Sequence, residues 1–492
     1  MTQINSLEAN RSRDEISLND ILRIEDSAEV LGICCPDTGI PLWSTIRSTF
    51  IRLMMGDLLY GTPLVVEGGA LRSRSRLRTA AMISRSFAHN ALHLWSLNHH
   101  PIVLMATGAR LIERNGSYFN CLSDYFVAAA PNQTFVIEDL FGWKWPFPRH
   151  HTNVLLHTPL RVEGALSGRL RTGGYRESAR ALVNLVSQRA ENMLGWNINE
   201  VRRQWLQNIC TSGAASLLPR YRTYRSFFKK TNAHLLIKEE ACYGSADNAS
   251  AILAARHLGM VTAEYQHGAV SAGHDAYNYA PAILNDHRYR QIFPDYFLTF
   301  GSWWGEQINA PVQKVVIGNP HRSETLGASA CVSEKEQHIL VLGDGRETIR
   351  YLEFCERLTA TLGSIAEVVF RPHPEERASV WAKYPDGFAG NVRVDAHQDI
   401  YSSFREAGSV VSEVSTGLFE AIGLVPKVFI WDTPKARFGF PVHPFQGFSD
   451  VNELARLVLD ENAGRVSTQQ IQNIWAPNWQ RNYLDFIEQA VR

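Results

Sequence analysis

Short apolar runs follow one another along most of the chain, separated by turns and by segments with helical spacing. Before residue 328 these runs predict strands at 101–107, 134–139, 153–158, 234–240, 260–268, 295–301 and 314–320. Helical spacing of apolar residues predicts an amphipathic helix at 40–60 and further helices at 175–213 and 247–258. Strands that alternate with helices are typical of a mostly parallel sheet of the Rossmann type.

The alternation is more regular after residue 338. Strands are predicted at 338–345, 366–374, 391–396, 408–417 and 427–432, and helices at 347–362, 399–406 and 418–423. The preceding segment, 328–337, is small, polar and charged, and it is interpreted as a domain boundary. The aromatic-rich stretch 469–492 predicts a helix that packs back on the first domain.

These patterns predict an α/β protein in four parts. We expect a weakly ordered leader at 1–30, a first Rossmann-like domain with a helical extension at 31–327, a second Rossmann-like domain at 328–466, and a crossover helix at 467–492. The length of 492 residues agrees with this division, because domains usually hold about 100–200 residues.

Composition narrows the class of protein. The 49 basic and 49 acidic residues give a net charge of zero, which argues against a dedicated nucleic-acid-binding protein. Seven cysteines without a C-x-x-C motif favour a reducing cytoplasm, and we expect neither a secretory signal nor a membrane-spanning segment. The basic run LRSRSRLR at 71–78 is interpreted as a solvated face; the alternative is contact to anionic lipid headgroups, as at the inner membrane, or to a phosphorylated acceptor.

Candidate chemistry lies where strands of the second domain end, because open α/β sheets bind ligands at that edge. Three motifs follow predicted strands: LGDGRE (342–347), RPHPEE (371–376) and SEVSTGLFEA (412–421). Each has a plain alternative, an ordinary turn or an N-cap, but together they favour a nucleotide site. The predicted nucleotide-binding residues are Gly343, Asp344, Gly345, Arg346, Arg371, His373, Pro374, Ser415, Thr416, Gly417 and Glu420.

The first domain offers two further candidates. Adjacent carboxylates, Glu239 and Glu240, follow a predicted strand and are candidates for a general base. The loop at 263–279 carries Gln266, His267, His274 and Tyr277, a density of hydrogen-bonding groups that suits a polyol, although a polar loop with one buried histidine is the alternative. The histidines show no metal-ligand spacing, so we expect no metal site.

Taken together, the residues resemble bacterial glycosyltransferases of the GT-B architecture that build capsular or other surface polysaccharides. The resemblance spans roughly residues 30–455 and is carried by IPLWSTIR, RNGSYFN (114–120), EYQHG (264–268), RPHP (371–374) and STGLFEA (415–421). It implies two Rossmann-like domains that face each other across a cleft, with the nucleotide donor held mainly by the second.

The same motifs narrow the implied family. The His-Pro pair followed by a Ser/Thr-rich helix start is similar to polysialyltransferases and Kdo transferases, which use CMP-sugars. RPHP also occurs in CDP-glycerol transferases of teichoic-acid synthesis. The resemblance implies that His373, Ser415 and Thr416 contact the donor phosphate and that Glu240, or Glu239, is the base. EEACYG departs from the family's acidic pair followed by Gly, so Asp124 and His267 are competing candidates for the base.

The sequence thus predicts a metal-independent enzyme that needs no cofactor and moves an activated sugar onto a glycan or glycolipid. The preferred donor is a CMP-activated acidic sugar, with a UDP- or GDP-hexose or a CDP-polyol as alternatives. Two other hypotheses are an NDP-sugar 2-epimerase and a non-catalytic scaffold that binds nucleotide sugars.

Overall fold

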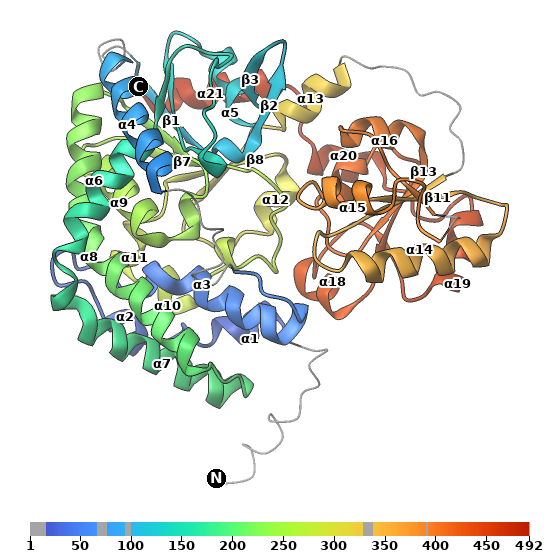
Figure 1. Ribbon diagram of the computed structural model, residues 1–492, viewed down its shortest axis with the longest axis horizontal. Coiled ribbons are helices and arrows are strands. Elements are labelled where there is room, and N and C mark those ends of the chain that lie inside the picture. Colours follow the sequence, from blue (N-terminus) through green and yellow to red (C-terminus); the bar gives the residue numbers. More distant parts are fainter. Residues whose placement is uncertain (1–15, 66–75, 94–99, 328–337, 390–391, 492) are drawn as a thin grey trace.

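The computed structural model describes residues 16–65, 76–93, 100–327, 338–389 and 392–491. In these residues the chain forms two α/β domains that lie side by side (Figure 1). The first half of the predicted leader, the predicted boundary at 328–337 and most of the basic run at 71–78 lie outside the described residues.

The first domain is built on a sheet of seven parallel strands in the order β5-β4-β1-β6-β7-β8-β9. The strands are β1 (Ile102–Ala106), β4 (Thr134–Glu138), β5 (Val154–Leu156), β6 (Leu235–Lys238), β7 (Val261–Tyr265), β8 (Tyr296–Thr299) and β9 (Gln313–Val316). The strand order reverses between β1 and β6, so the loops after these two strands part to opposite sides. Such a switch point is where open α/β sheets bind ligands.

Helices cover both faces of this sheet. They are α1 (Leu18–Leu22), α2 (Ala28–Gly32), α3 (Trp43–Met55), α4 (Arg76–His93), α5 (Ser123–Ala129), α6 (Thr158–Arg169), α7 (Arg176–Leu194), α8 (Glu200–Thr231), α9 (Ser245–Arg256), α10 (Pro281–Asn285), α11 (His287–Arg290), α12 (Ser302–Glu306) and α13 (Pro320–Gly327). α8 and α9 pack on one face through residues such as Phe228 and Ile252, and α5 packs on the other through Phe126. An antiparallel hairpin, β2 (Leu111–Arg114) and β3 (Ser117–Asn120), follows β1.

The N-terminal region differs from its prediction. Residues 16–30, expected to be weakly ordered, hold α1 and the start of α2, because Ser17 caps α1 in a capping box and Leu18, Ile21 and Leu22 are buried. The helix expected at 40–60 is present as α3 followed directly by a π-helical turn, Gly56–Tyr60, and more of α3 is buried than an amphipathic helix would bury. Its Arg47 is 2% exposed and is held by Glu25 at 2.6 Å.

The second domain has six parallel strands in the order β12-β11-β10-β13-β14-β15. They are β10 (His338–Leu342), β11 (Val368–Arg371), β12 (Arg393–Val394), β13 (Ala407–Ser412), β14 (Lys427–Trp431) and β15 (Gln446–Phe448). Its helices are α14 (Thr348–Leu362), α15 (Arg377–Lys383), α16 (Ile400–Glu406), α17 (Gly417–Ala421), α18 (Pro434–Gly439) and α19 (Val451–Leu459). The order reverses between β10 and β13, which places a second switch point at the loops that the sequence singled out.

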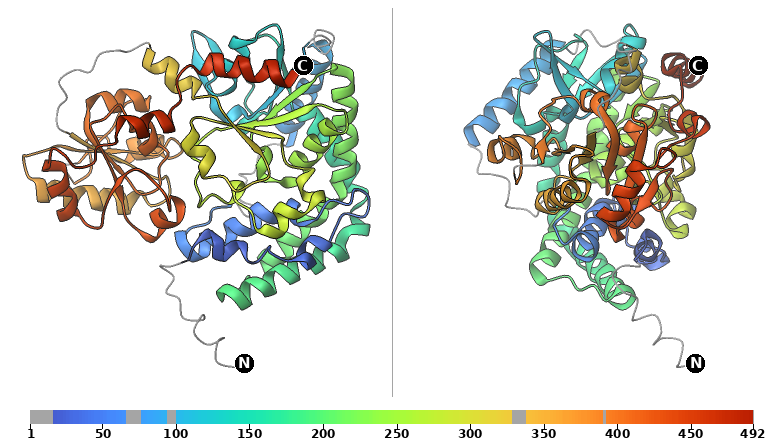
Figure 2. Two further views of the ribbon diagram at one scale, coloured as in Figure 1. Left: turned by 180° about the vertical axis from the view of Figure 1, so that it is seen from behind. Right: turned by 90° about the vertical axis from the view of Figure 1, so that its right-hand side faces the viewer.

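The C-terminal segment returns to the first domain as two helices, where the sequence predicted one. α20 (Thr468–Ile474) lies beside the second domain and α21 (Trp479–Val491) runs along the first, as Figure 2 shows in its left view. The break holds Pro477 and Asn478, which has φ of 60°. Tyr483 and Phe486 of α21 pack with the strands of the first sheet.

The predicted fold class is confirmed: two Rossmann-like domains with an N-terminal helical part and a C-terminal crossover, the GT-B arrangement. The two domains also touch directly. The Ser271 hydroxyl donates to the Gly439 carbonyl at 2.5 Å, and Arg322 donates to the Ile422 carbonyl at 2.5 Å. In the described part of the chain, no helix combines the length and the apolar character that crossing a membrane requires.

Candidate functional site

A cavity of about 590 Å³ opens between the two domains. This volume lies within the range of roughly 300–1,000 Å³ that is usual for small-molecule sites. The first domain contributes Arg110, Cys121, Leu122, His267, Gly268, Phe300, Trp304, Asn319 and His321 to its wall. The second domain and the crossover contribute Leu342, Gly343, Asp344, Arg371, Pro372, His373, Pro374, Arg377, Gln398, Asp399, Ile400, Tyr401, Val414, Ser415, Thr416, Gly417, Glu420 and Trp475.

The loop after β10 forms one wall of the cavity through Gly343 and Asp344. Gly345 has φ of 75°, a left-handed conformation that favours glycine, and a side chain there would meet His373 at 2.9 Å. The glycine therefore lets the loops after β10 and β11 touch. Arg346 lies outside this cavity: it donates to the Pro63 carbonyl at 3.1 Å and lines an adjoining hollow of about 350 Å³.

The loop after β11 places His373 in the cavity wall. Its Nδ1 accepts the N–H of Glu375 at 3.3 Å, and its Nε2 has no hydrogen bond to any described residue. Arg371, expected to bind phosphate, is 4% exposed and is paired with Asp395. It also donates to the Ser403 hydroxyl at 2.8 Å, so the guanidinium fixes this part of the second domain and has little left to offer a ligand.

The loop after β13 brings Ser415, Thr416 and Gly417 to the cavity. The Ser415 hydroxyl accepts the Gly417 N–H at 3.2 Å, which is the plain turn that the sequence allowed as an alternative. Glu420 also lines the cavity, and burial raises its pKa to about 7 although the Arg322 guanidinium acts in the opposite direction. The three predicted motifs thus meet at one place.

His267 faces these loops from the first domain. Burial, together with the nearby Arg110 guanidinium, lowers the pKa of His267 to about 3, so its imidazole is neutral near pH 7. Nε2 lies 3.4 Å from the Tyr243 hydroxyl, and the buried Nδ1 has no partner among the described residues. A neutral imidazole at the cavity wall is able to accept a proton.

The two adjacent glutamates have different environments. Glu240 is exposed and has φ of 59°. Glu239 is 4% exposed and accepts hydrogen bonds from the Thr107 N–H at 2.8 Å and the Tyr265 hydroxyl at 2.9 Å. Burial raises the pKa of Glu239 to about 7, and its Oε1 has no described partner. Both lie in a separate cavity of the first domain, outside the interdomain wall.

Three other candidates are buried away from the interdomain cavity. Asp124 is fully buried and pairs with Arg149 at 3.0 Å, and Tyr277 donates to Glu264 at 2.9 Å. Gln266 donates to the Gly268 carbonyl at 2.8 Å, so it shapes the loop that carries His267. A further predicted sugar-binding residue, His274, lines the adjoining hollow together with Arg346.

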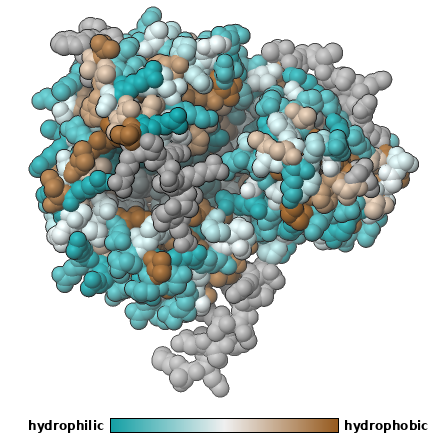
Figure 3. Space-filling view, in the orientation of Figure 1, coloured by the Kyte–Doolittle hydropathy of each residue, from teal (hydrophilic) through white to brown (hydrophobic). Residues whose placement is uncertain are grey.

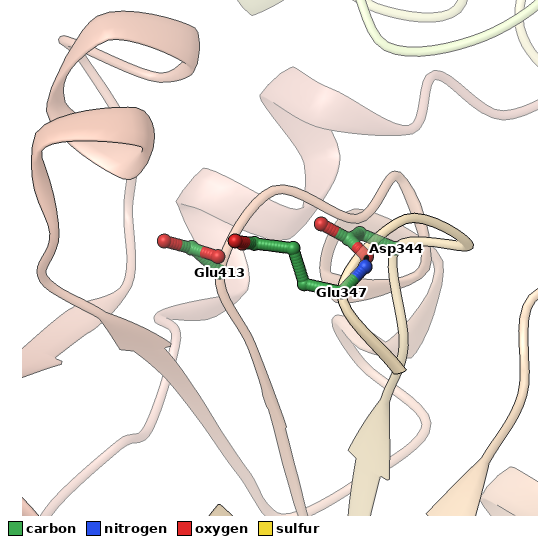
Figure 4. A group of neighbouring side chains, drawn as sticks. All are labelled: Asp344, Glu347 and Glu413. Atoms are coloured by element: carbon green, nitrogen blue, oxygen red, sulfur yellow. Dashed lines mark hydrogen bonds between the residues drawn. The ribbon is translucent and has the colours of Figure 1, made fainter. Parts of the chain in front are cut away.

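Three carboxylates of the second domain, Asp344, Glu347 and Glu413, lie near one another (Figure 4). Arg350 bonds Glu347 at 2.8 Å and Glu413 at 3.0 Å, and the Lys435 ammonium also pairs with Glu347. Two cations thus neutralise two of the three carboxylates. This pairing favours an ion-pair network over a cation site, and the expected absence of an essential metal stays a prediction.

One cation that the first domain places in the cavity, Arg110, was not among the residues predicted from the sequence. Arg110 is exposed, and neither a hydrogen bond nor an ion pair joins its guanidinium to any described residue. It follows β1 within a few residues, so the rule that ligands bind at strand ends was sufficient to find it. The aromatic side chains of Trp304, Tyr401 and Trp475 in the wall come from three distant segments.

No protein-family model and no curated protein matches the chain. Among solved structures, the chain is similar to a UDP-GlcNAc 2-epimerase from Methanocaldococcus jannaschii, with 10% identity and a TM-score of 0.42 over 80% of this chain and 99% of the other. It is similar to MurG from Acinetobacter baumannii, with 12% identity and a TM-score of 0.40 over 79% of this chain and 99% of the other. It is also similar to the wall teichoic acid polymerase TagF, with 12% identity and a TM-score of 0.41 over 84% of this chain and 97% of the other. Similarities at this level assign neither an activity nor a substrate to this chain.

Proposed function

We propose that the protein is a glycosyltransferase that moves a sugar from a nucleotide-activated donor to a glycan or glycolipid. One observation carries the proposal: three strand-end loops of the second domain and the pair His267 and Arg110 of the first line the same interdomain cavity. The loops lie at the switch point of their sheet, where a nucleotide is expected to bind.

The proposed reaction uses both walls of the cavity. The acceptor hydroxyl attacks the anomeric carbon of the donor, the bond from that carbon to the phosphate oxygen breaks, and His267 takes the hydroxyl proton. Arg110 and His373 stabilise the charge that develops on the departing phosphate. The bound phosphates also offset the Arg110 charge, which raises the pKa of His267 toward the range in which a base works at neutral pH.

We assign a CMP-activated acidic sugar as the donor, supported by the RPHP and STG motifs that meet at the cavity. A thermal-shift series with CMP, CDP, UDP, GDP and dTDP tests the assignment. At a hundredfold excess over Kd, a ligand stabilises the fold by about 2.7 kcal/mol, so CMP and CDP are expected to raise Tm by several degrees. A response to UDP alone would overturn the donor, and no response to any nucleotide would overturn the proposed function. The Arg114→Met variant, altered outside the cavity, should respond like the wild type.

We also propose that the first domain touches an anionic membrane surface from the cytoplasmic side. Exposed apolar residues gather on the side that carries α4 and α6 (Figure 3). Leu92 of α4 is 78% exposed, and Leu170, the C-cap of α6, is 92% exposed. Exposed Arg78 and Arg169 lie on the same helices, a combination that suits anionic headgroups.

Sedimentation with vesicles tests the membrane contact. The wild type is expected to co-sediment with vesicles of one-third phosphatidylglycerol and less with neutral vesicles, and the Leu92→Asp/Leu170→Asp variant to lose at least tenfold in partitioning. Leu459→Asp, which alters an exposed leucine of the second domain, is the matched control. Equal sedimentation of all three proteins would contradict the contact.

A further inference from the structure

The first domain holds a second polar cavity of about 280 Å³ at the carboxyl ends of β1, β4 and β6. It is separate from the interdomain cavity, and Tyr243 lies between the two: it lines the second cavity, while its hydroxyl is 3.4 Å from Nε2 of His267. The exposed residues Arg161 and Glu240 belong to its wall. The proposed chemistry of the donor uses none of these residues except His267.

An unpaired lysine lines this cavity. Lys238, the last residue of β6, is 7% exposed. In the described part of the chain, no group hydrogen-bonds its ammonium and no carboxylate lies within the 4.0 Å of an ion pair. Burying an ammonium without a partner is costly, so the arrangement points to an anionic group supplied from outside the chain.

Asp247, an acidic residue of the same cavity wall, is already committed to other partners. Asp247 accepts hydrogen bonds from Arg220 at 2.5 Å and from the Tyr224 hydroxyl at 2.8 Å. Its carboxylate lies 3.7 Å from His157, and the charges of His157, Arg220 and Lys238 hold the pKa of Asp247 well below its usual range. Arg220, at 2.5 Å, is thus the cation that bonds the Asp247 carboxylate, and Lys238 acts on it only from beyond ion-pair distance.

The start of α9 adds a second feature that favours an anion. This 12-residue helix begins at Ser245 beside the cavity, and its N-cap, Gly244, supplies no side-chain hydrogen bond. Gly244 and Ser245 both have φ near 77°, so the backbone is held in the left-handed region at this point. The free N–H groups and the positive end of the helix dipole face the same space as Lys238.

The same cavity also offers acceptors for hydroxyl groups. Glu239 keeps Oε1 without a described partner, and Asp139, whose Oδ1 accepts the Gly108 N–H at 2.6 Å, lies beside it. A ligand that fits these groups has one acidic group and several hydroxyls.

We propose that this cavity binds an acidic saccharide, with its carboxylate or phosphate at Lys238 and the start of α9 and its hydroxyls at Glu239 and Asp139. The identification of this saccharide as part of the acceptor rests on the proposed function. In that case the acceptor chain runs past Tyr243 and presents its reacting hydroxyl to His267. The binding itself requires no transfer activity.

Calorimetric titration of the full-length protein tests the proposal with three probes: methyl glucuronide, glucose 6-phosphate and neutral methyl glucoside. The wild type is expected to bind one of the acidic probes at least tenfold more tightly than the neutral one, and the preferred probe identifies the acidic group. Lys238→Met should abolish this preference, and Lys238→Arg should retain part of it. Lys383→Met, altered in the second domain, is the control.

Saccharide affinity and the Tm shift with nucleotides together separate a failure of this proposal from a failure of the proposed function. Lys238→Met should keep the wild-type Tm shift with nucleotides, which also shows that it folds. Should it fail to fold, Arg161→Met at the mouth of the cavity replaces it and should weaken binding of the acidic probe severalfold. Equal affinity for acidic and neutral probes, or a preference that survives in the folded variants, would overturn the proposal. Acidic-probe binding that depends on Lys238, without any nucleotide response, would overturn only the proposed function.

Discussion

Asparagine in place of His267 is expected to lower kcat for sugar transfer about 10²–10⁴-fold, the usual contribution of a general base. Asparagine fills similar space but accepts no proton, so the donor should still bind and raise Tm as in the wild type. The measurement is the release of nucleotide from the donor that the thermal-shift series identifies.

His274→Asn is the matched control for this substitution. His274 also approaches the Tyr243 hydroxyl, at 3.3 Å, and burial lowers its pKa to about 4, yet it lines the adjoining hollow and not the donor cavity. We expect a loss of less than tenfold. A His267→Asn enzyme with the wild-type kcat would exclude His267 as the base.

The pH profile separates His267 from Glu239. A base must be deprotonated, so activity falls as the pH drops through its pKa, and kcat/KM reports the free enzyme. The pKa is about 3 for His267 and about 7 for Glu239. If His267 is the base, its titration should cause no fall in kcat/KM between pH 8 and pH 5. If Glu239 is the base, kcat/KM should fall as the pH drops through about 7. Glu420 titrates near the same pH, so an acid limb assigns the base to Glu239 only when Glu239→Gln removes it.

The sequence predicted the sheets well because their strands are buried. Runs such as Ile102–Ala106 and 339–342 are covered on both faces and are therefore continuously apolar. The elements it missed include exposed or short ones: β15 has three residues, and β2 of the hairpin is mostly exposed. A signal for that hairpin was present, since Asn115 and Gly116 at its turn have φ of 50° and 75°.

The candidate site was predictable to the extent that it follows strand ends. Gly343, His373 and Thr416 were found by that rule and line one cavity. Arg371 and Tyr277 have residue types suited to ligands, but their partners, Asp395 and Glu264, are brought to them by the fold. Whether a polar side chain is used inside the protein or is left for a ligand depends on tertiary contacts that a single sequence does not contain.

Arg110 provides the second large effect: Arg110→Met is expected to lower kcat/KM for the nucleotide sugar about 10²–10³-fold. Its guanidinium is a cation that the first domain brings to the cavity without an internal partner among the described residues, so it is free to bind donor phosphate. Removing one preorganised donor to a developing charge has a cost of this size. Because methionine keeps the length and apolar stem of the side chain, the fold should be unaffected.

Comparing two nucleotides with the nucleoside that lacks phosphate gives this prediction its specificity. Loss of a phosphate contact should weaken binding of CMP or CDP and leave binding of cytidine unchanged, whereas a general disturbance of the cavity would weaken all three. The control is Arg114→Met, since Arg114 lies on β2 and donates to the Tyr125 hydroxyl at 3.3 Å outside the cavity. A wild-type kcat/KM in Arg110→Met would contradict this role for Arg110. The second domain alone would then hold the phosphates and stabilise the departing nucleotide.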